Sequence, residues 1–337
     1  MKKINIIVPV YNNVSELDRC IKSIVCQTFV DWEAIFVNDG SIDGSGELLD
    51  SWAEKDERIT VIHQRNQGAA SARNTGLEKV SAPFITMIDA DDEVLPDMLQ
   101  QLYSVMVEKR VDMVICGMVR RKREKDINNM PCLSEGYHQA YPKHLFTRFY
   151  PSPFAKLYRR EILQSFHVLF PEGVVMGEDY IFVATYWQYT QSIYVIKKAL
   201  YIYHENLSSA TSRFLEGKLP FRVYETTLKL HPMVLEKVKQ NLKGVHDLAD
   251  WSKALYRNQL IENDWIIQDV KHSPEKKQKL KLLSKQLFSE MESELSLFSV
   301  LKIVTLYRMS WMRGRFARFA GRVKRCLVTL FSCKKYK

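Results

Sequence analysis

The feature that most constrains the fold is the apolar run at residues 84–88, which ends in acids at Asp89, Asp91, Asp92 and Glu93. A short apolar run bounded by polar residues is typical of a buried strand. In a parallel α/β sheet, ligands bind at the carboxyl ends of the strands, where these acids would lie. Crowded carboxylates raise one another's pKa unless a cation is present, and Mg²⁺ typically takes one or two carboxylates plus substrate phosphates. The run therefore predicts either a divalent-metal site or an acidic loop that caps the helix beginning near Pro96.

Strand and helix patterns alternate along the first two thirds of the chain. Apolar strands are predicted at residues 4–10, 34–37, 59–63, 84–88 and 113–116, with amphipathic helices between them. The later pattern predicts helices at 155–163 and 180–188 and strands at 193–196 and 200–203. Such alternation predicts a Rossmann-like, mostly parallel sheet with right-handed crossovers and helices on both faces. Beyond Pro220 the periodicity is helical, so the predicted fold class is α/β with a C-terminal helical extension.

Three regions are predicted: an α/β domain at residues 1–217, a helical subdomain at 218–295 and a basic tail at 296–337. The 337-residue chain has 49 Lys and Arg against 39 Asp and Glu, and its last acid is Glu294. The tail mixes cations with Leu, Val, Phe and Trp, which is typical of a helix lying on anionic lipid. A nucleic-acid-binding tail is the competing hypothesis. We disfavour it, and expect no nucleic-acid partner, because the apolar residues are mainly aliphatic and no nucleic-acid motif accompanies them.

The cysteines and the N-terminus bear on the compartment. The six cysteines show no CxxC spacing, so we expect reduced thiols. No signal-peptide pattern opens the chain, and no apolar stretch reaches the ~20 residues of a membrane span. We expect a cytoplasmic protein that is peripheral on the inner face of the cell membrane.

Polar groups recur where predicted elements meet: Tyr11–Asn12, Asp39, Asp89 with Asp91, and Glu178–Asp179. Each alone has a simpler structural explanation, such as an Asx-type turn at Asp39 or a helix N-terminus at Asp179. Likewise, Arg73 alone would be a solvated charge or an ion-pair partner, and His204 alone a polar loop residue. Those simpler explanations do not account for the ordered recurrence.

In this order the motifs resemble the inverting glycosyltransferases of family 2, which have the GT-A fold. The resemblance covers roughly residues 3–215. It rests on Ile-Ile-Val-Pro-Val-Tyr-Asn at 6–12, Val-Asn-Asp-Gly-Ser-Ile-Asp at 37–43, the Asn-Gln-Gly to Asn-Thr-Gly run at 66–76, Asp-Ala-Asp-Asp at 89–92 and Gly-Glu-Asp at 177–179. One departure is Asn38, where the family commonly has a second Asp.

The resemblance implies a site for a nucleotide-sugar donor, most simply a UDP-linked one. Pro9 and Tyr11 would lie against the base, and Asp39 would accept from the uracil imide. Arg73 would lie near the base or diphosphate, and Asp89 would hold the ribose.

The resemblance also implies a metal and a base. Asp91, the second acid of the DXD motif, would ligate Mn²⁺ or Mg²⁺, and His204 would lie against the diphosphate or the metal. Asp179 matches the family's catalytic base. From its place one residue away on the same helix, we expect Glu178 to point elsewhere and to orient the acceptor or the loop. A helix N-terminus and nearby cations predict a low pKa for Asp179. One base and one displacement would invert the anomeric centre.

The expected function is therefore a metal-dependent inverting hexosyl- or N-acetylhexosaminyltransferase. It would move a sugar to a hydroxyl of a lipid-linked glycan acceptor in capsule, exopolysaccharide or similar polysaccharide biosynthesis. One alternative is a nucleotidyltransferase, but residues 10–13 do not form the triphosphate loop that such an enzyme needs. The other is a non-catalytic nucleotide-sugar-binding protein, and retention of both Asp91 and Asp179 argues against it.

Overall fold

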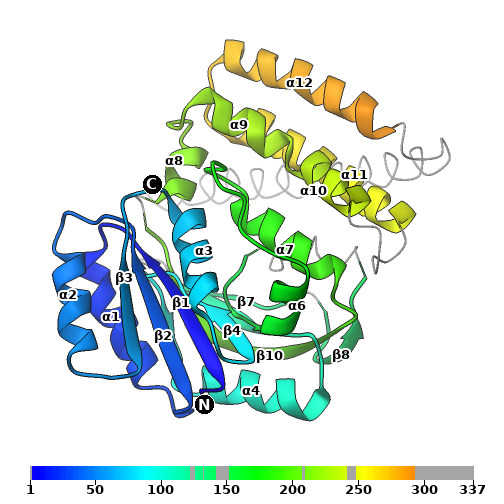
Figure 1. Cartoon of the computed structure of the whole chain (residues 1–337). Coiled ribbons are helices and arrows are strands. Elements are labelled where there is room, and N and C mark those ends of the chain that lie inside the picture. The colour runs from blue at the N-terminus through cyan, green and yellow to red at the C-terminus, as the bar shows by residue number, and fades with distance from the viewer. Residues whose placement is uncertain are drawn as a thin grey trace, which may run out of the picture.

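In a computed structural model we describe residues 2–121, 126–131, 133–141, 152–206, 209–240 and 248–292 (Figure 1). The strands are β1 (Ile4–Val10), β2 (Trp32–Asn38), β3 (Ile59–His63), β4 (Phe84–Met87), β5 (Glu93–Val94), β6 (Met113–Arg121), β7 (Asp126–Asn129), β8 (Gly136–Gln139), β9 (Lys156–Arg159) and β10 (Ser192–His204). The helices are α1 (Val14–Val25), α2 (Ser45–Ala53), α3 (Ala69–Lys79), α4 (Met98–Lys109), α6 (Arg160–Ser165), α7 (Glu178–Gln188), α8 (Ala210–Leu215), α9 (Phe221–Leu228), α10 (Leu230–Gln240), α11 (Leu248–Asp264), the π-helical turn η1 (Trp265–Asp269) and α12 (Pro274–Glu292).

The described strands form one sheet in the order β3-β2-β1-β4-β9-β6-β10-β5, with β7 on β6 and β8 on β10. The pairs β1–β2, β2–β3, β1–β4 and β6–β10 are parallel. The chain runs from β1 outward to β3 and then returns to the other side of β1 to form β4. The strand order therefore reverses between β1 and β4, which is the place where open α/β sheets bind ligands. The α/β fold class expected from the sequence is confirmed.

The middle of the sheet departs from the simple alternation. Strand β9 runs antiparallel between β4 and β6. The helix predicted at residues 155–163 is therefore wrong in its first half, and α6 begins only at Arg160. Lys156, Leu157 and Tyr158 are fully buried between two strands, so tertiary packing overrides their helix-like pattern. The two strands predicted at 193–196 and 200–203 are one strand, β10, with register shifts around Ala199.

Helices cover both faces of the sheet, with α1 and α2 to the left of strands β1 to β3 and α3 to their right in Figure 1. The helices from α8 to α12 form a layer above the sheet in that view, which we call the upper layer. Within this layer, α8, α9, η1 and α12 share a hydrophobic cluster of their own, whereas α10 and α11 join the main core. Among the described helices, none has the length and apolarity that crossing a membrane requires.

Helix α7 is buried along nearly its whole length, because it lies between the sheet and α10. It begins after Gly177, which has a left-handed φ of 93°. A side chain at Gly177 would overlap Leu230 of α10, so only glycine suits this close approach. The first residues of α7 are Glu178 and Asp179, and this contact fixes where they lie.

Candidate active site

Residues 89–92, which we call the acid turn, follow β4 directly. Strand β4 ends at Met87, and the Asp92 N–H donates to the Asp89 carbonyl at 3.0 Å, so the acids lie on a turn and not on a strand. The Arg19 guanidinium of α1 donates to the Asp91 carbonyl at 2.6 Å. The acid turn after β4 is therefore anchored to α1, the helix after β1. The strand order reverses between β1 and β4.

Arg73 brings the acid turn and the start of α7 together. Its guanidinium lies 2.9 Å from Asp89 Oδ1, 3.1 Å from Asp179 Oδ1 and 3.6 Å from Glu178 Oε1. Arg73 is only 5% exposed, and its guanidinium lies over the Phe170 ring. Residues 73, 89, 178 and 179, brought together from three parts of the chain, thus form one cluster of three half-buried carboxylates around a buried guanidinium, which we call the Arg73 cluster.

Burial and an excess of negative charge shift the pKa values of the two acids at the start of α7. Burial, with the charge of Asp89, raises the pKa of Asp179 to about 6, although Arg73 and Lys156 oppose the rise. Burial, with the charge of Asp179, also raises the pKa of Glu178 to about 8. Burial would lower the pKa of Arg73, but its three acidic neighbours raise it. A single guanidinium does not compensate for the desolvation of three carboxylates.

Two expectations about the start of α7 are wrong. The predicted low pKa of Asp179 fails because burial outweighs both Arg73 and the helix N-terminus. Glu178 does not point away from Asp179, since both carboxylates face the same nitrogen of Arg73.

Asp91 is not one of the acids of the Arg73 cluster. Its Oδ2 accepts a hydrogen bond from the Asn206 amide at 3.3 Å, and burial together with the charge of Asp89 raises its pKa. In the described part of the chain, no three His, Cys, Asp or Glu side chains are grouped to hold a metal ion. The Asp91 carboxylate nevertheless fits a Mg²⁺ or Mn²⁺ ion that takes its remaining ligands from substrate phosphates, because such ions prefer oxygen donors.

The structure places His204 beside Glu93, with Nε2 2.6 Å from Glu93 Oε1. Burial lowers the pKa of His204, although Glu93 opposes the shift. A role for His204 as a metal or diphosphate ligand stays a prediction, and it would require this contact with Glu93 to break.

Asp39 lies at the end of β2, where its carboxylate is fully engaged. Its Oδ1 accepts from the Gln64 amide at 2.8 Å and from the Gln67 N–H at 2.9 Å, and its Oδ2 accepts from the Gly68 N–H at 2.8 Å. Asp39 therefore holds the loop that leads into α3, the helix of Arg73. The predicted contact with a uracil imide would add to these bonds or replace one of them.

The predicted base-binding edge is formed by the ends of β1 and β2. Pro9 is half-buried and Tyr11 is 49% exposed at the end of β1. Asn12 ties this end to the loop after β2, since its N–H donates to Ser41 Oγ and its side-chain oxygen accepts from the Ile42 N–H. The exposed ring of Tyr11 is thus presented by a well-braced loop.

Asn38, the departure from the family motif, has structural partners. Its amide bonds to His63 Nδ1 at 2.9 Å, and its oxygen accepts from the Ser41 N–H at 3.0 Å. These bonds account for an amide at this position.

Sequence reasoning missed two buried residues: Tyr201, which contacts the acid turn, and Lys156, whose pKa is influenced by the charge of Asp179. The Tyr201 hydroxyl donates to Asp92 Oδ2 at 2.6 Å, and the Lys156 ammonium donates to the Ser152 carbonyl at 2.5 Å. Burial lowers the pKa of Lys156 to about 7, although Cys116 and Asp179 oppose the shift. Tyr201 read only as an apolar strand residue, and Lys156 fell in the segment predicted to be helical.

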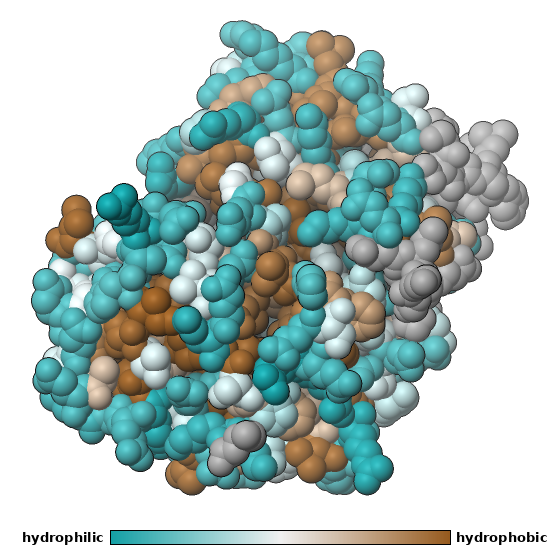
Figure 2. Space-filling view, in the orientation of Figure 1, coloured by the Kyte–Doolittle hydropathy of each residue, from teal (hydrophilic) through white to brown (hydrophobic). Residues whose placement is uncertain are grey.

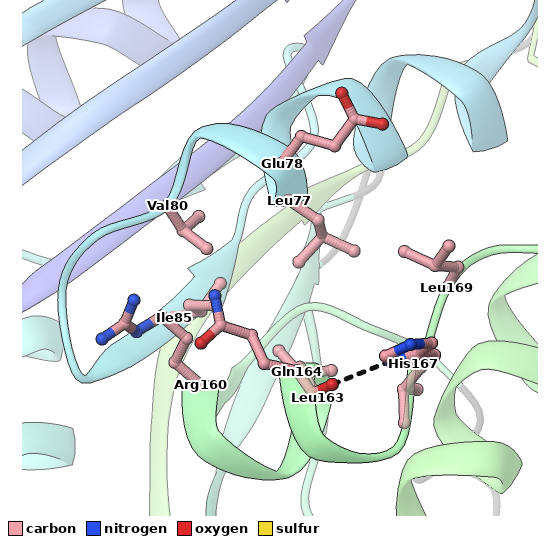
Figure 3. A pocket seen from close by; sticks show the side chains of 10 residues that line it. Leu77, Glu78, Val80, Ile85, Arg160, Leu163, Gln164, His167 and Leu169 are labelled. Atoms are coloured by element: carbon pink, nitrogen blue, oxygen red, sulfur yellow. Dashed lines mark hydrogen bonds between the residues drawn. The ribbon is translucent and has the colours of Figure 1, made fainter.

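A pocket of about 320 Å³ lies apart from the acids, between the end of α3 and α6 (Figure 3). Leu77, Val80, Ile85 and Leu163 give it apolar walls, and the surface between these two helices is correspondingly brown in Figure 2. None of the predicted site residues lines it. The candidate chemistry therefore belongs to the carboxyl edge of the sheet and not to this pocket.

Known proteins resemble this chain in both sequence and structure. The chain is 36% identical over 215 residues to the uncharacterized glycosyltransferase EpsJ of Bacillus subtilis (strain 168), a match that covers 62% of each chain. It is 28% identical over 271 residues to the putative glycosyltransferase EpsH of the same organism, covering 78% of this chain and 77% of that one. The chain thus spans less than two thirds of the first of these relatives.

Among solved structures, S. aureus TarS 1-349 in complex with UDP-GlcNAc superposes with a TM-score of 0.72 at 18% identity, covering 93% of this chain and 92% of that one. At this identity the likeness establishes the fold. Residues 5–166 match the model of the family described as Glycosyl transferase family 2. Residues 5–166 of this chain are therefore similar to family 2 glycosyltransferases, and the chain has the GT-A fold expected from the sequence.

Proposed function

We propose that the protein is a metal-dependent, inverting glycosyltransferase that uses a UDP-linked sugar and a glycan hydroxyl as acceptor. The observation that carries the proposal is the Arg73 bridge between Asp89, on the acid turn, and Asp179, at the start of α7. The bridge joins an acid suited to bind a donor and an acid suited to act as a base in one half-buried site. TarS, whose structure holds UDP-GlcNAc, supports the choice of a uridine donor.

Asp179 would act as the general base. A base must be ionised to accept the acceptor's proton, and a pKa of about 6 leaves Asp179 ionised at neutral pH while keeping it a better base than an ordinary Asp. Glu178, whose pKa is about 8, would stay protonated at neutral pH and could donate a hydrogen bond to an acceptor hydroxyl. The two neighbouring acids would thus take different protonation states in the same site.

Asp89 and Asp91 would hold the donor. Asp89 would bind the ribose, and Asp91 would ligate the cation, with most other ligands supplied by the diphosphate. When bound, Mn²⁺ or Mg²⁺ would neutralise the charge that develops on the departing diphosphate. The mannosyltransferase PcManGT from Pyrobaculum calidifontis, in complex with GDP-Man and Mn²⁺, has a TM-score of 0.51 with this chain and supports divalent metal use. Tyr11 and Pro9 would contact the base.

The experiment is a panel of nucleotide sugars incubated with the full chain, with Mn²⁺, Mg²⁺ or EDTA. The proposal predicts metal-dependent release of nucleoside diphosphate, fastest with a UDP-sugar. Release of pyrophosphate from a nucleoside triphosphate and a sugar phosphate would instead identify a nucleotidyltransferase. Tight UDP binding with no release under any condition would favour the non-catalytic alternative.

We also propose that the acceptor is lipid-linked and that the protein works on the inner face of the cell membrane. The support is the composition of the tail at 296–337, which lies outside the described residues and has no acid. The division into regions at 217 and 295 is part of the same proposal. Removing residues 296–337 is expected to abolish co-sedimentation with anionic liposomes while sparing release of UDP. Equal sedimentation of both forms would contradict the membrane role.

A further inference from the structure

Asp92, the last acid of the acid turn, is turned into the protein. It is fully buried, and both of its carboxylate oxygens are engaged by β10. Oδ2 accepts from the Tyr201 hydroxyl at 2.6 Å, and Oδ1 accepts from the His204 N–H at 2.8 Å. Asp92 therefore lacks the exposure that a ligand for a donor or a metal needs, and it does not cap α4, which begins at Met98.

Tyr201 also contacts the turn directly. The Asp89 N–H donates to the Tyr201 hydroxyl oxygen at 3.1 Å. A backbone N–H can only donate, so the single hydroxyl proton is directed to Asp92. The Tyr201 ring stacks on Phe154 with centroids 4.8 Å apart, which fixes the side chain. The Tyr201 hydroxyl thus forms hydrogen bonds at both ends of the acid turn, with Asp89 and with Asp92.

The other polar contacts of the turn come from α1, α3 and the residues after β10. They are Arg19 at the Asp91 carbonyl, Cys20 at the Asp89 carbonyl, Arg73 at the Asp89 side chain and Asn206 at the Asp91 side chain. Arg73 is shared with α7, and the Asn206 bond is long at 3.3 Å. The bonds that Tyr201 and the His204 N–H make with the turn are the support that comes from the sheet itself, through β10.

We propose that Asp92 and Tyr201 are positioning residues that hold Asp89 and Asp91 in the geometry needed to bind a nucleoside diphosphate with a divalent cation. This inference rests on the proposed function. Groups that orient the ligands of a metal typically change metal affinity or activity by ~10–100-fold when they are removed. Loss of the Tyr201 hydroxyl leaves Asp89 N–H and Asp92 Oδ2 buried without a partner, so the turn is expected to rearrange.

The chain offers a matched control in Tyr186 of α7. Its buried hydroxyl also accepts from a backbone N–H, that of Arg159 at 2.9 Å, and donates to an acceptor, the Asp112 carbonyl at 2.7 Å. Replacing either tyrosine by Phe breaks one hydrogen bond from a backbone N–H and one to an oxygen, which is a carboxylate for Tyr201 and a backbone carbonyl for Tyr186. Only Tyr201→Phe breaks them at the acid turn.

The test is calorimetric titration of UDP into the full chain at a series of Mn²⁺ concentrations, with thermal unfolding measured on the same samples. Tyr201→Phe is expected to raise the Mn²⁺ concentration needed for half-maximal UDP binding by ~10–100-fold. Tyr186→Phe is expected to leave it within twofold of wild type, even where the two variants lower Tm alike. Asp92→Asn, which keeps the size of the side chain, is expected to shift the Mn²⁺ requirement in the same direction as Tyr201→Phe.

An unchanged Mn²⁺ requirement in Tyr201→Phe, or an equal shift in both tyrosine variants, would overturn the inference and leave the proposed function standing. Absence of UDP binding by the wild-type chain at every Mn²⁺ concentration would overturn both.

Discussion

Asp39 is a buried acid and the acids of the Arg73 cluster are half-buried, and their carboxylates are satisfied in different ways. Asp39 accepts three hydrogen bonds from neutral donors, two of them backbone N–H groups. The acids at 89, 178 and 179 share one guanidinium, and burial raises the pKa of both acids at the start of α7. Dipoles can satisfy one buried charge locally, whereas three carboxylates around one cation leave a negative excess. Asp39 therefore suits a fixed structural contact, and the acids near Arg73 suit a site completed by a cation and a proton.

The largest expected effect is that of Asp91→Asn. This change removes the proposed ligand of the cation that would complete the site next to the Arg73 cluster. We expect turnover to fall by roughly 10³-fold or more, because metal stabilisation of a leaving group is worth several kcal/mol. Metal-dependent UDP binding should be lost in calorimetry, while the far-UV circular dichroism spectrum stays that of wild type. Undiminished UDP–Mn²⁺ binding in this variant would contradict the assignment.

Asp179→Asn should separate chemistry from binding. Removal of a general base typically costs ~10²–10⁴-fold in rate. Asp179 is not proposed to touch the nucleotide, so the Kd for UDP with Mn²⁺ should change little. Sugar transfer and UDP binding are measured on the same preparation. Transfer near the wild-type rate would place the base elsewhere, and Glu178 would be the first alternative.

Arg73→Met tests the charge balance of the Arg73 cluster directly. Asp179 must be ionised to act, so wild-type kcat should rise with pH through about 6. Loss of a neighbouring opposite charge typically moves a carboxyl pKa upward by ~1–3 units. The acidic limb of the pH–rate profile should therefore shift to higher pH by that amount, and activity at pH 6 should fall more than activity at pH 9. A limb that stays in place would show that Arg73 does not control the base.

Asp39→Asn should have the smallest effect on chemistry and a clear effect on stability. The new amide N–H₂ would face backbone N–H donors, and such an unsatisfied buried contact costs ~1–3 kcal/mol. We expect a lower free energy of unfolding in urea titrations, with kcat at saturating donor changing by less than tenfold. A kcat loss as large as that of Asp179→Asn would place Asp39 with the charged acids and erase the contrast.

Much of the fold could be predicted because local patterns and tertiary packing agree there. Strands β1 and β3 begin and end where the apolar runs predict, and α7 follows its Gly-bounded loop. Strand β9 could not be predicted, because its partners β4 and β6 are distant in sequence and nothing local distinguishes it from a helix. The same holds for β5, which is two residues long and formed by pairing with β10.

In the candidate site too, residues in local motifs could be predicted, whereas effects of distant contacts could not. The motif order identified Asp89, Arg73 and Asp179, and the structure brings these three together. Tyr201 was missed because its role depends on contacts more than 100 residues away, with Asp89 and Asp92. The pKa of Asp179 was mispredicted because burial is a property of the assembled core and outweighs the helix N-terminus and Arg73.

The contact between Gly177 and Leu230 bears on how this chain can be divided or recombined. The turn that presents Asp179 is closed by a side chain of α10, which lies beyond residue 217. A fragment ending at residue 217 would expose the face of α7 that α10 covers, and it would release the backbone that carries the proposed base. The upper layer therefore cannot be exchanged independently of α7. A chimaera that exchanges this layer between relatives would have to keep the contact between Leu230 and Gly177. Without that contact, the chimaera would have a donor site but no correctly placed base.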